Sequence, residues 1–218
     1  AEAYRQAARR EFYRGGGLWE NGSQTSQACA LAFGLCADEE TRRLTGERLV
    51  EAVHRADDHP DFGIVGSKHV FRELSKLGRT DLAFRMATQK TLPSFLYWKE
   101  RGGTTFMEEL DPDKAPSQNH VMFGDVMAWA YQYLAGIRDV EDGFRRFTLA
   151  PDCITALDYV TARVETPYGV VSSAWRRQDG HIRYEFTVPP GTRAEVRANG
   201  TSAVYGPGTH GLEMKEND

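Results

Sequence analysis

The chain has 218 residues, a formal net charge of −4 at pH 7, 40% hydrophobic residues and 11% aromatic residues. This length allows one core of ordinary size, or one domain with a smaller second domain. The 27 basic residues are outnumbered by 31 acidic ones and form no basic tract, so we expect no nucleic-acid partner. No apolar run reaches the roughly 20 residues that span a bilayer, so we also expect no membrane partner.

The N-terminus lacks the charged, apolar and small-residue order of a signal peptide, and Ala1 opens directly into a helical pattern. We therefore expect that the sequence begins inside a longer protein. The three cysteines, Cys29, Cys36 and Cys153, show no metal-ligand spacing and predict no disulfide scaffold. We expect them to be small buried apolar residues.

Helical periodicity dominates the first two thirds of the chain. The first helix is expected to end at Gly15, and Asp38 and Thr80 are expected to cap two later helices. Pro93 starts a further short segment, which contains Phe95, Leu96, Tyr97 and Trp98. The expected helices cover residues 1–14, 23–36, 63–78, 80–89 and 120–137, of which the last has the strongest pattern. Another is expected after Asp38, where the helical period shows in Leu44, Leu49, Val50 and Val53.

Two features of this helical part leave alternatives open. Trp19 lies in the polar loop 18–23, where it either stacks on a sugar ring or fills the core. Residues 54–59 contain two histidines and two aspartates, which form either a metal site or a group of solvated polar residues. We favour the solvated group, because spacing alone does not bring metal ligands together.

The stretch GGTTFMEELDPDKAPSQNH, residues 102–120, is the strongest candidate for a functional site. Glu108 and Glu109 follow a turn-like pair of glycines, so that one of them can be aimed into a cavity. Asn119 and His120 stand directly before an apolar helical run that can support them. The alternative is a solvated acidic loop between two helices.

Short β-type runs replace the helical period after Gly143. They cover residues 144–151, 156–169, 170–177, 182–191 and 193–200, and they are separated by turn signals such as Asp179-Gly180 and Asn199-Gly200. The fold class is therefore mainly α followed by β, with a helical domain over 1–138 and a small antiparallel β-sandwich over 139–218.

Eight motifs follow one another along most of the chain. They are QTSQACALAFGL (24–35), GRTDLAF (78–84), PSFLYW (93–98), GGTTFMEE (102–109), NH (119–120), WAYQYLAGI (129–137), GFRRFTLAP (143–151) and TPYGVVSSAW (166–175). In this order they resemble the α-L-rhamnosidases of glycoside hydrolase family seventy-eight. The resemblance implies the C-terminal half of an (α/α) six-hairpin barrel, an α/α toroid, followed by a small β-sandwich. It also implies inverting hydrolysis of terminal α-L-rhamnosides by a bacterial enzyme.

Inversion requires a carboxylic acid that protonates the leaving oxygen and a carboxylate, about 6.5 to 9.5 Å away, that activates a water molecule. The resemblance places the general base at Glu108, with Glu109 as the alternative if the register slips by one. It places a substrate-contacting histidine at His120, beside Asn119.

The sequence departs from the family pattern next to the proposed base. Met107 stands where the family usually has Trp, and Leu110 stands where a second aromatic residue is expected. Trp98 and Trp19 are candidates to restore aromatic contact with the substrate.

The resemblance also implies that the general acid comes from barrel helices upstream of residue 24. We count about six helices where a closed barrel needs twelve, so we expect the missing upstream part of the same enzyme as a partner and no activity in the isolated chain. The alternative is a catalytically inactive carbohydrate-binding or structural module. No metal or other cofactor is expected, because acid–base glycoside hydrolysis needs neither. A periplasmic or extracellular location is what the resemblance implies.

Overall fold

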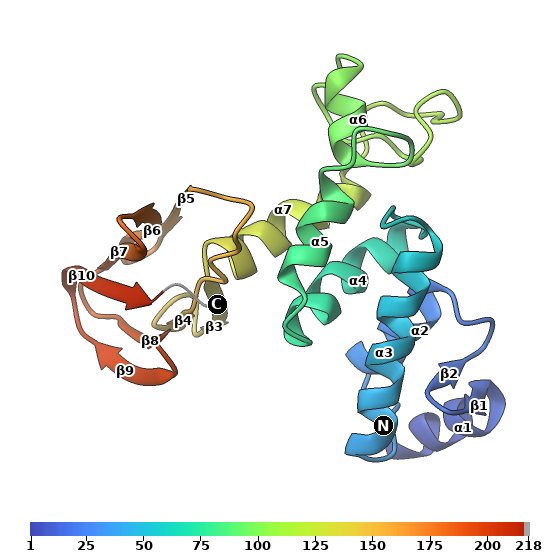
Figure 1. Cartoon of the computed structure of the whole chain (residues 1–218). Coiled ribbons are helices and arrows are strands. Elements are labelled where there is room, and N and C mark those ends of the chain that lie inside the picture. Colours follow the sequence, from blue (N-terminus) through green and yellow to red (C-terminus); the bar gives the residue numbers. More distant parts are fainter. Residues whose placement is uncertain (216–218) are drawn as a thin grey trace. The chain divides into compact units, whose positions relative to one another are not determined.

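The computed structural model describes residues 1–215, which fall into two compact units that meet in the sequence between Val126 and Met127. The first unit is mainly helical and the second mainly β-stranded (Figure 1). Within residues 1–215, no helix combines the length and the apolar character that a bilayer crossing needs. The mainly α then β fold class expected from the sequence is confirmed.

Six α-helices and a short β-ribbon make up most of the first unit. The helices are α1 (Glu2–Phe12), α2 (Gln24–Ala32), α3 (Glu39–Arg55), α4 (Ile64–Lys76), α5 (Thr80–Ala87) and α6 (Phe95–Glu100). Asp38 caps α3 as expected, its carboxylate accepting from the Thr41 amide at 2.7 Å. Thr80 does not cap α5, because the N-cap position is Arg79 and no side chain caps that end.

The glycine run after α1 differs from a simple helix stop. Strands β1 (Tyr13–Gly15) and β2 (Leu18–Trp19) pair as an antiparallel ribbon around the glycines. A side chain at Gly17 would lie 2.4 Å from the Leu44 backbone, and the φ of this residue is +76°. Only glycine fits there, so the run serves close packing as well as helix termination.

The core of the first unit forms around α2, which packs against α3 and α4. Gln27 is fully buried and bridges two backbone groups of the ribbon, accepting from the Trp19 amide and donating to Gly17 O, both at 2.9 Å. Gln24 also bridges two backbone groups, because its side chain donates to His59 O and accepts from the Asp61 amide. These glutamines satisfy loop backbone groups that would otherwise be buried without partners.

The segment expected as one helix over 120–137 consists of three helical turns of different pitch. They are a 3₁₀ turn η1 (Val121–Gly124), α7 (Asp125–Trp129) and a π turn η2 (Ala130–Leu134). The Ala135 amide donates to Ala130 O at 3.0 Å, the five-residue spacing of a π turn. Apolar periodicity did not reveal the change, because all three turn types bury nearly the same face.

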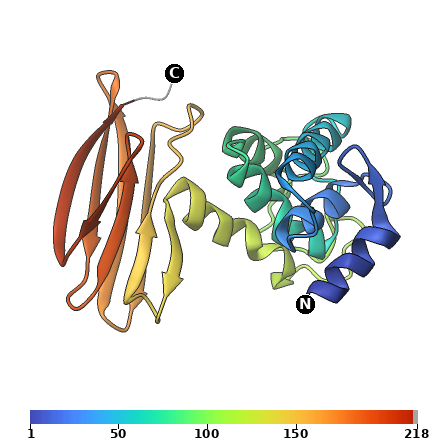
Figure 2. The same ribbon diagram turned by 90° about the horizontal axis from the view of Figure 1, so that it is seen from below.

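Two four-stranded sheets make up the second unit, which Figure 2 shows as two layers of strands. One sheet has the order β10-β7-β6-β5 and the other β3-β4-β8-β9. The strands are β3 (Ile137–Glu141), β4 (Arg146–Leu149), β5 (Tyr159–Thr166), β6 (Gly169–Gln178), β7 (His181–Val188), β8 (Arg193–Ala198), β9 (Thr201–Tyr205) and β10 (Gly208–Lys215).

The five predicted β-type runs are strands β4 to β8, and β3, β9 and β10 complete the sandwich. The pairing departs from a purely antiparallel arrangement at one place, because β4 runs parallel to β8. Residues of both sheets form one apolar core that includes Trp175, Tyr184 and Phe186. All three cysteines are free, in agreement with the absence of a predicted disulfide scaffold. They are half-buried, whereas the sequence led us to expect buried residues.

Two side chains of β6 donate hydrogen bonds to backbone carbonyls at the end of η2. The acceptors are Leu134, the last residue of η2, and Ala135, the residue after it. The Trp175 indole donates to Leu134 O at 2.8 Å, and the Ser173 hydroxyl donates to Ala135 O at 2.5 Å. Gly136 follows with a φ of +79°, and a side chain there would meet the Pro151 nitrogen at 2.2 Å. The chain can turn into β3 only because this residue is glycine.

Candidate active site

The loop between α6 and η1 contains the candidate residues and is held by its own backbone. The Glu108 amide donates to Ser117 O at 2.9 Å, and the His120 amide donates to Phe106 O at 2.7 Å. Residues 105–108 and 117–120 therefore run antiparallel beside each other, and Figure 1 shows the loop next to α6. This pairing brings Glu108 and His120 onto neighbouring segments although twelve positions separate them in the sequence.

Trp98 on α6 fastens this loop. Its indole N–H donates to Leu110 O at 2.8 Å, and its side chain is 3% exposed. The ring packs edge to face against three phenylalanine rings, with centroids 5.1 to 6.5 Å away: Phe95, Phe106 and Phe123. The structure thus gives Trp98 a positioning role, while contact with a substrate stays a prediction.

Met107 is also buried, with only 7% of its surface exposed. A side chain at Gly103 would lie 3.2 Å from the Met107 methyl group and 2.8 Å from Trp98 O. The residue before Glu108 is therefore directed into the protein, where an apolar side chain is required. The glycine pair expected to be a turn also provides close packing here.

The adjacent glutamates have different surroundings. Glu108 is half-buried, and no described side chain pairs with its carboxylate. Glu109 is exposed and lies near Lys114. The pKa of the Lys114 amine is raised mainly by its hydrogen bond to Asp111, and the charge of Glu109 adds a smaller contribution. Glu109 thus belongs to an exposed charged group, whereas Glu108 keeps an unused carboxylate.

His120 has a ring nitrogen that lacks a partner. Its Nδ1 atom is buried, and no acceptor or donor among residues 1–215 reaches it. A buried polar atom without a hydrogen bond costs free energy, so this nitrogen is suited to a group supplied from outside the chain. Asn119 is exposed beside it, and its backbone amide donates to the Ser117 hydroxyl at 3.3 Å.

Other candidates lie on other elements. Trp19 on β2 is 2% exposed, donates its indole N–H to Thr45 Oγ1 at 3.0 Å and packs on the Tyr13 ring. This placement agrees with the core alternative, and a sugar-stacking role stays a prediction. His54 pairs with Asp58 at 2.6 Å, whereas His59 contacts backbone carbonyls and Thr91. Across residues 1–215, no three His, Cys, Asp or Glu side chains gather where a metal ion could be held.

Sequence reasoning missed an ion pair next to the candidate loop. Arg72 on α4 contacts the Asp125 carboxylate at 3.1 Å, and both side chains are largely buried. The pair ties the first turn of α7 to α4, five residues after His120. Nothing in the sequence marks the two residues as partners, because 53 positions separate them.

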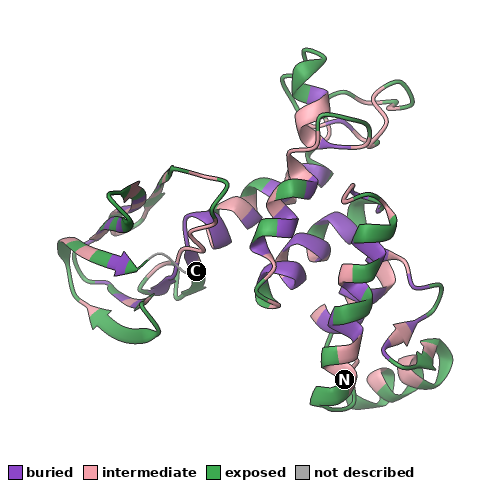
Figure 3. Ribbon diagram, viewed as in Figure 1, coloured by how far each residue is buried: buried purple, intermediate pink, exposed green. Residues whose placement is uncertain are grey.

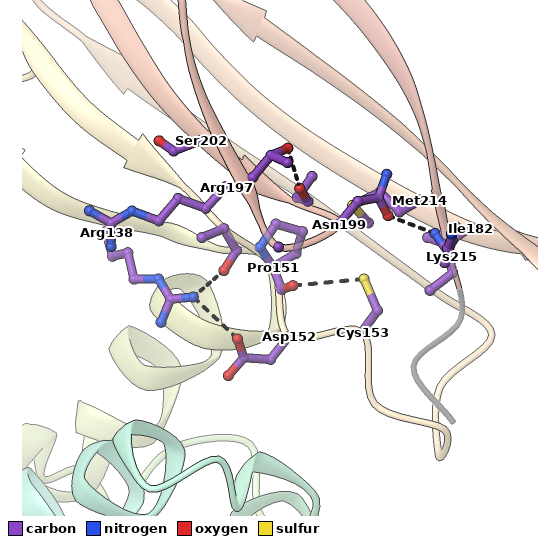
Figure 4. A pocket seen from close by; sticks show the side chains of 14 residues that line it. Arg138, Pro151, Asp152, Cys153, Ile182, Arg197, Asn199, Ser202, Met214 and Lys215 are labelled. Atoms are coloured by element: carbon purple, nitrogen blue, oxygen red, sulfur yellow. Dashed lines mark hydrogen bonds and ion pairs between the residues drawn. The ribbon is translucent and has the colours of Figure 1, made fainter.

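A cavity of about 450 Å³ in the second unit has both polar and apolar residues in its lining, and Arg138 in this lining is already paired (Figure 4). Arg138 donates to Ala150 O and contacts the Asp152 carboxylate at 3.2 Å. The Arg138 guanidinium also lies 4.8 Å from the centre of the Tyr133 ring. Burial raises the pKa of Cys153, which also lines this cavity, to about 12, so its thiol is a poor nucleophile. These contacts brace the sandwich.

The chain matches two family models with adjoining ranges. Residues 1–134 match the bacterial alpha-L-rhamnosidase six-hairpin glycosidase domain, and residues 136–213 match the bacterial alpha-L-rhamnosidase C-terminal domain. The predicted domain boundary at 138/139 stays a prediction.

Curated relatives carry the same description. An alpha-L-rhamnosidase of Formosa agariphila is 31% identical over 85% of this chain, and one of Streptomyces avermitilis is 28% identical over 98% of it. The chain spans about a fifth of the length of these relatives, 21% and 22%.

Solved structures of relatives show the same fold. The native rhamnosidase of Aspergillus terreus superposes with a TM-score of 0.91 at 27% identity, covering 98% of this chain and 26% of that one. The Streptomyces avermitilis enzyme in complex with L-rhamnose gives 0.88 at 27% identity, covering 97% and 23%. With both domain models matched in sequence order, the chain belongs to the bacterial alpha-L-rhamnosidase family.

Proposed function

We propose that this chain is the C-terminal portion of an inverting glycoside hydrolase that cleaves terminal α-L-rhamnosides, with Glu108 as the general base. The observation that carries the proposal is the paired loop 105–120. It presents an unpaired, half-buried Glu108 carboxylate and a buried His120 Nδ1 without a partner. The binding of L-rhamnose by the Streptomyces avermitilis relative supports the choice of sugar.

In this mechanism, Glu108 removes a proton from a water molecule while the water oxygen forms a bond to the anomeric carbon. The bond from that carbon to the leaving oxygen breaks on the opposite face, and a carboxylic acid protonates the leaving oxygen. Glu108 must be ionised to act as a base. His120 Nδ1 hydrogen-bonds a sugar hydroxyl, and Asn119 lies beside it.

The general acid comes from the upstream part of the same enzyme, which is the partner that this chain needs. The apolar face of α1 supports this requirement, because none of its residues is buried (Figure 3). Tyr4 is 84% exposed, and together with Phe12 and Phe33 it borders an apolar groove of about 760 Å³. Exposed apolar surface of this kind marks a contact site. An upstream helical segment of the barrel covers it.

The test compares Glu108→Gln with Glu109→Gln in the longer enzyme that contains this chain. Hydrolysis of p-nitrophenyl α-L-rhamnoside is measured together with circular dichroism, which checks folding. Glu108→Gln should lower kcat by about 10²- to 10⁴-fold, because the amide cannot accept the proton. Glu109→Gln is the matched control, since it removes the same charge one residue away and should retain most activity.

Two results would contradict the assignment. Equal losses from both changes would mean that charge, rather than a general base at Glu108, limits the rate. An NMR spectrum that shows the α-anomer as the first product would exclude inversion. If the folded enzyme hydrolyses neither rhamnosides nor other glycosides, the catalytically inactive module becomes the better description.

A further inference from the structure

The outer face of the β10-β7-β6-β5 sheet carries an organised row of exposed side chains. In the strand register, Tyr159 lies opposite Arg176, Arg176 opposite Arg183, and Arg183 opposite Glu213. All four residues are exposed, and Tyr159 keeps 56% of its surface in contact with solvent. The row crosses all four strands of the sheet.

The next row along the strands is lined by smaller side chains. Thr161 lies opposite Ala174, Ala174 opposite Glu185, and Glu185 opposite Gly211. Because Ala174 and Gly211 are small, the surface is hollow at this row. A cavity of about 410 Å³ lies over β5 to β7, and a second of about 480 Å³ lies over β7 and β10. Gln178 and Arg183 line both, so the two cavities form one groove across the sheet.

The two arginines of the first row keep hydrogen-bond donors that the protein does not use. Arg176 has no ion pair or hydrogen-bond acceptor among residues 1–215, and its guanidinium carbon lies 4.8 Å from the centre of the Tyr159 ring. Arg183 reaches the Glu185 carboxylate only at 4.0 Å. Arg176 and Arg183 lie directly opposite each other, and like charges in such positions on a sheet repel. An anion bound between the two guanidinium groups removes this repulsion.

The acidic residues of the groove narrow the class of ligand. Glu185 and Glu213 would repel a phosphate backbone, which places a negative charge at every unit. They accept hydrogen bonds from hydroxyl groups, and the Tyr159 ring offers an apolar face to which C–H groups can pack. A ligand with one anionic group, several hydroxyls and an apolar face satisfies all of these features.

We propose that this groove binds an anionic saccharide, separately from hydrolysis at Glu108. Its carboxylate or sulfate group lies between Arg176 and Arg183, and its sugar ring packs against Tyr159. Glu185 accepts hydrogen bonds from sugar hydroxyls. The stacking of Arg176 on Tyr159 holds both side chains in place before the ligand arrives, which lowers the entropic cost of binding.

The test is isothermal titration of the 218-residue chain with three tetrasaccharides of equal length. They are a galactose tetrasaccharide that ends in one galacturonate, a galactose tetrasaccharide that carries one sulfate group, and neutral galactotetraose. We expect at least one acidic ligand to bind, and the comparison of the two shows whether a carboxylate or a sulfate is preferred. The neutral sugar should bind at least tenfold more weakly. Equal affinity for the neutral sugar, or no binding of either acidic ligand, would overturn the proposal.

Three variants localise the binding. Tyr159→Ala and Arg176→Gln should each weaken it about tenfold or more, whereas Tyr159→Phe should keep it because the ring remains. Arg163→Gln is the matched control, since Arg163 lies on the same face of β5 but outside the groove. If Arg163→Gln weakens binding as much as Arg176→Gln, the attraction is general to the charged face and the groove is not a site.

Discussion

Trp98→Phe tests whether the indole of α6 holds the loop that carries Glu108. The change keeps an aromatic ring beside its three phenylalanine neighbours but removes the N–H that donates to Leu110 O at 2.8 Å. A hydrogen bond of this kind contributes about 1 kcal/mol net, and the smaller ring loses about another 1 kcal/mol of buried contact. Loss of the hydrogen bond alone would raise the opening equilibrium of the loop about fivefold, and the whole loss would raise it about thirtyfold.

The measurement is amide hydrogen exchange at Glu108 and His120, whose N–H groups close the paired loop at 2.9 and 2.7 Å. Both amides should exchange about fivefold to thirtyfold faster in the variant, because exchange follows local opening. Trp19→Phe is the matched control, since it also removes a buried indole donor, at 3.0 Å from Thr45, but at another place in the same unit. Unchanged exchange in Trp98→Phe, or the same acceleration in both variants, would refute the reasoning.

Three further predictions concern the second unit. Gly136→Ala should lower the free energy of unfolding by at least about 3 kcal/mol in urea titration, because strain at positive φ adds to a backbone clash. The control Gly180→Ala, at φ +77° with open space around it, should cost only about 1 to 2 kcal/mol, and equal losses would contradict the clash. Ser173→Ala should cost about 2 to 4 kcal/mol, because it leaves the Tyr184 hydroxyl, 3.0 Å away, and a backbone carbonyl unpaired. The double variant with Tyr184→Phe should cost less than the sum of the single changes, and strict additivity would contradict this coupling. Burial raises the pKa of Cys153 to about 12, so its thiolate is scarce at pH 8. Iodoacetamide should therefore alkylate Cys153 last of the three cysteines, as followed by mass spectrometry. Early alkylation of Cys153 would contradict its burial.

Local chemistry predicted much of the fold. Asp38 caps the helix that its position indicated, because a short side-chain acceptor before the first turn satisfies free amides wherever the helix packs. The alternation of β7, in which every second residue is buried, likewise fixes the strand and its inner face. The Asp179-Gly180 turn was predictable because Asp and Gly tolerate the positive φ that a tight hairpin requires. Both residues adopt positive φ in the structure.

Features that depend on distant partners could not be predicted. The parallel pairing of β4 with β8 joins segments more than forty residues apart, and no local pattern specifies it. Strand β3 was missed because Ile137 continues the apolar run of the preceding helical turns. In the candidate site, the Gly and Thr residues indicated a loop, but its anchoring by Trp98 depends on an acceptor twelve residues later. The roles of Glu108 and His120 rest on family resemblance and stay predictions.

The hydrogen bonds from Ser173 and Trp175 to the carbonyls at 135 and 134 have a consequence for exchanging domains between relatives. The family models divide the chain between residues 134 and 136, so a chimaera joined there would combine these donors with acceptors from another sequence. The compact second unit begins at Met127 and keeps each donor with its own acceptor. A swap made at Met127 should therefore fold as a transplantable module, whereas one made after Gly136 would separate these donors from their own acceptors.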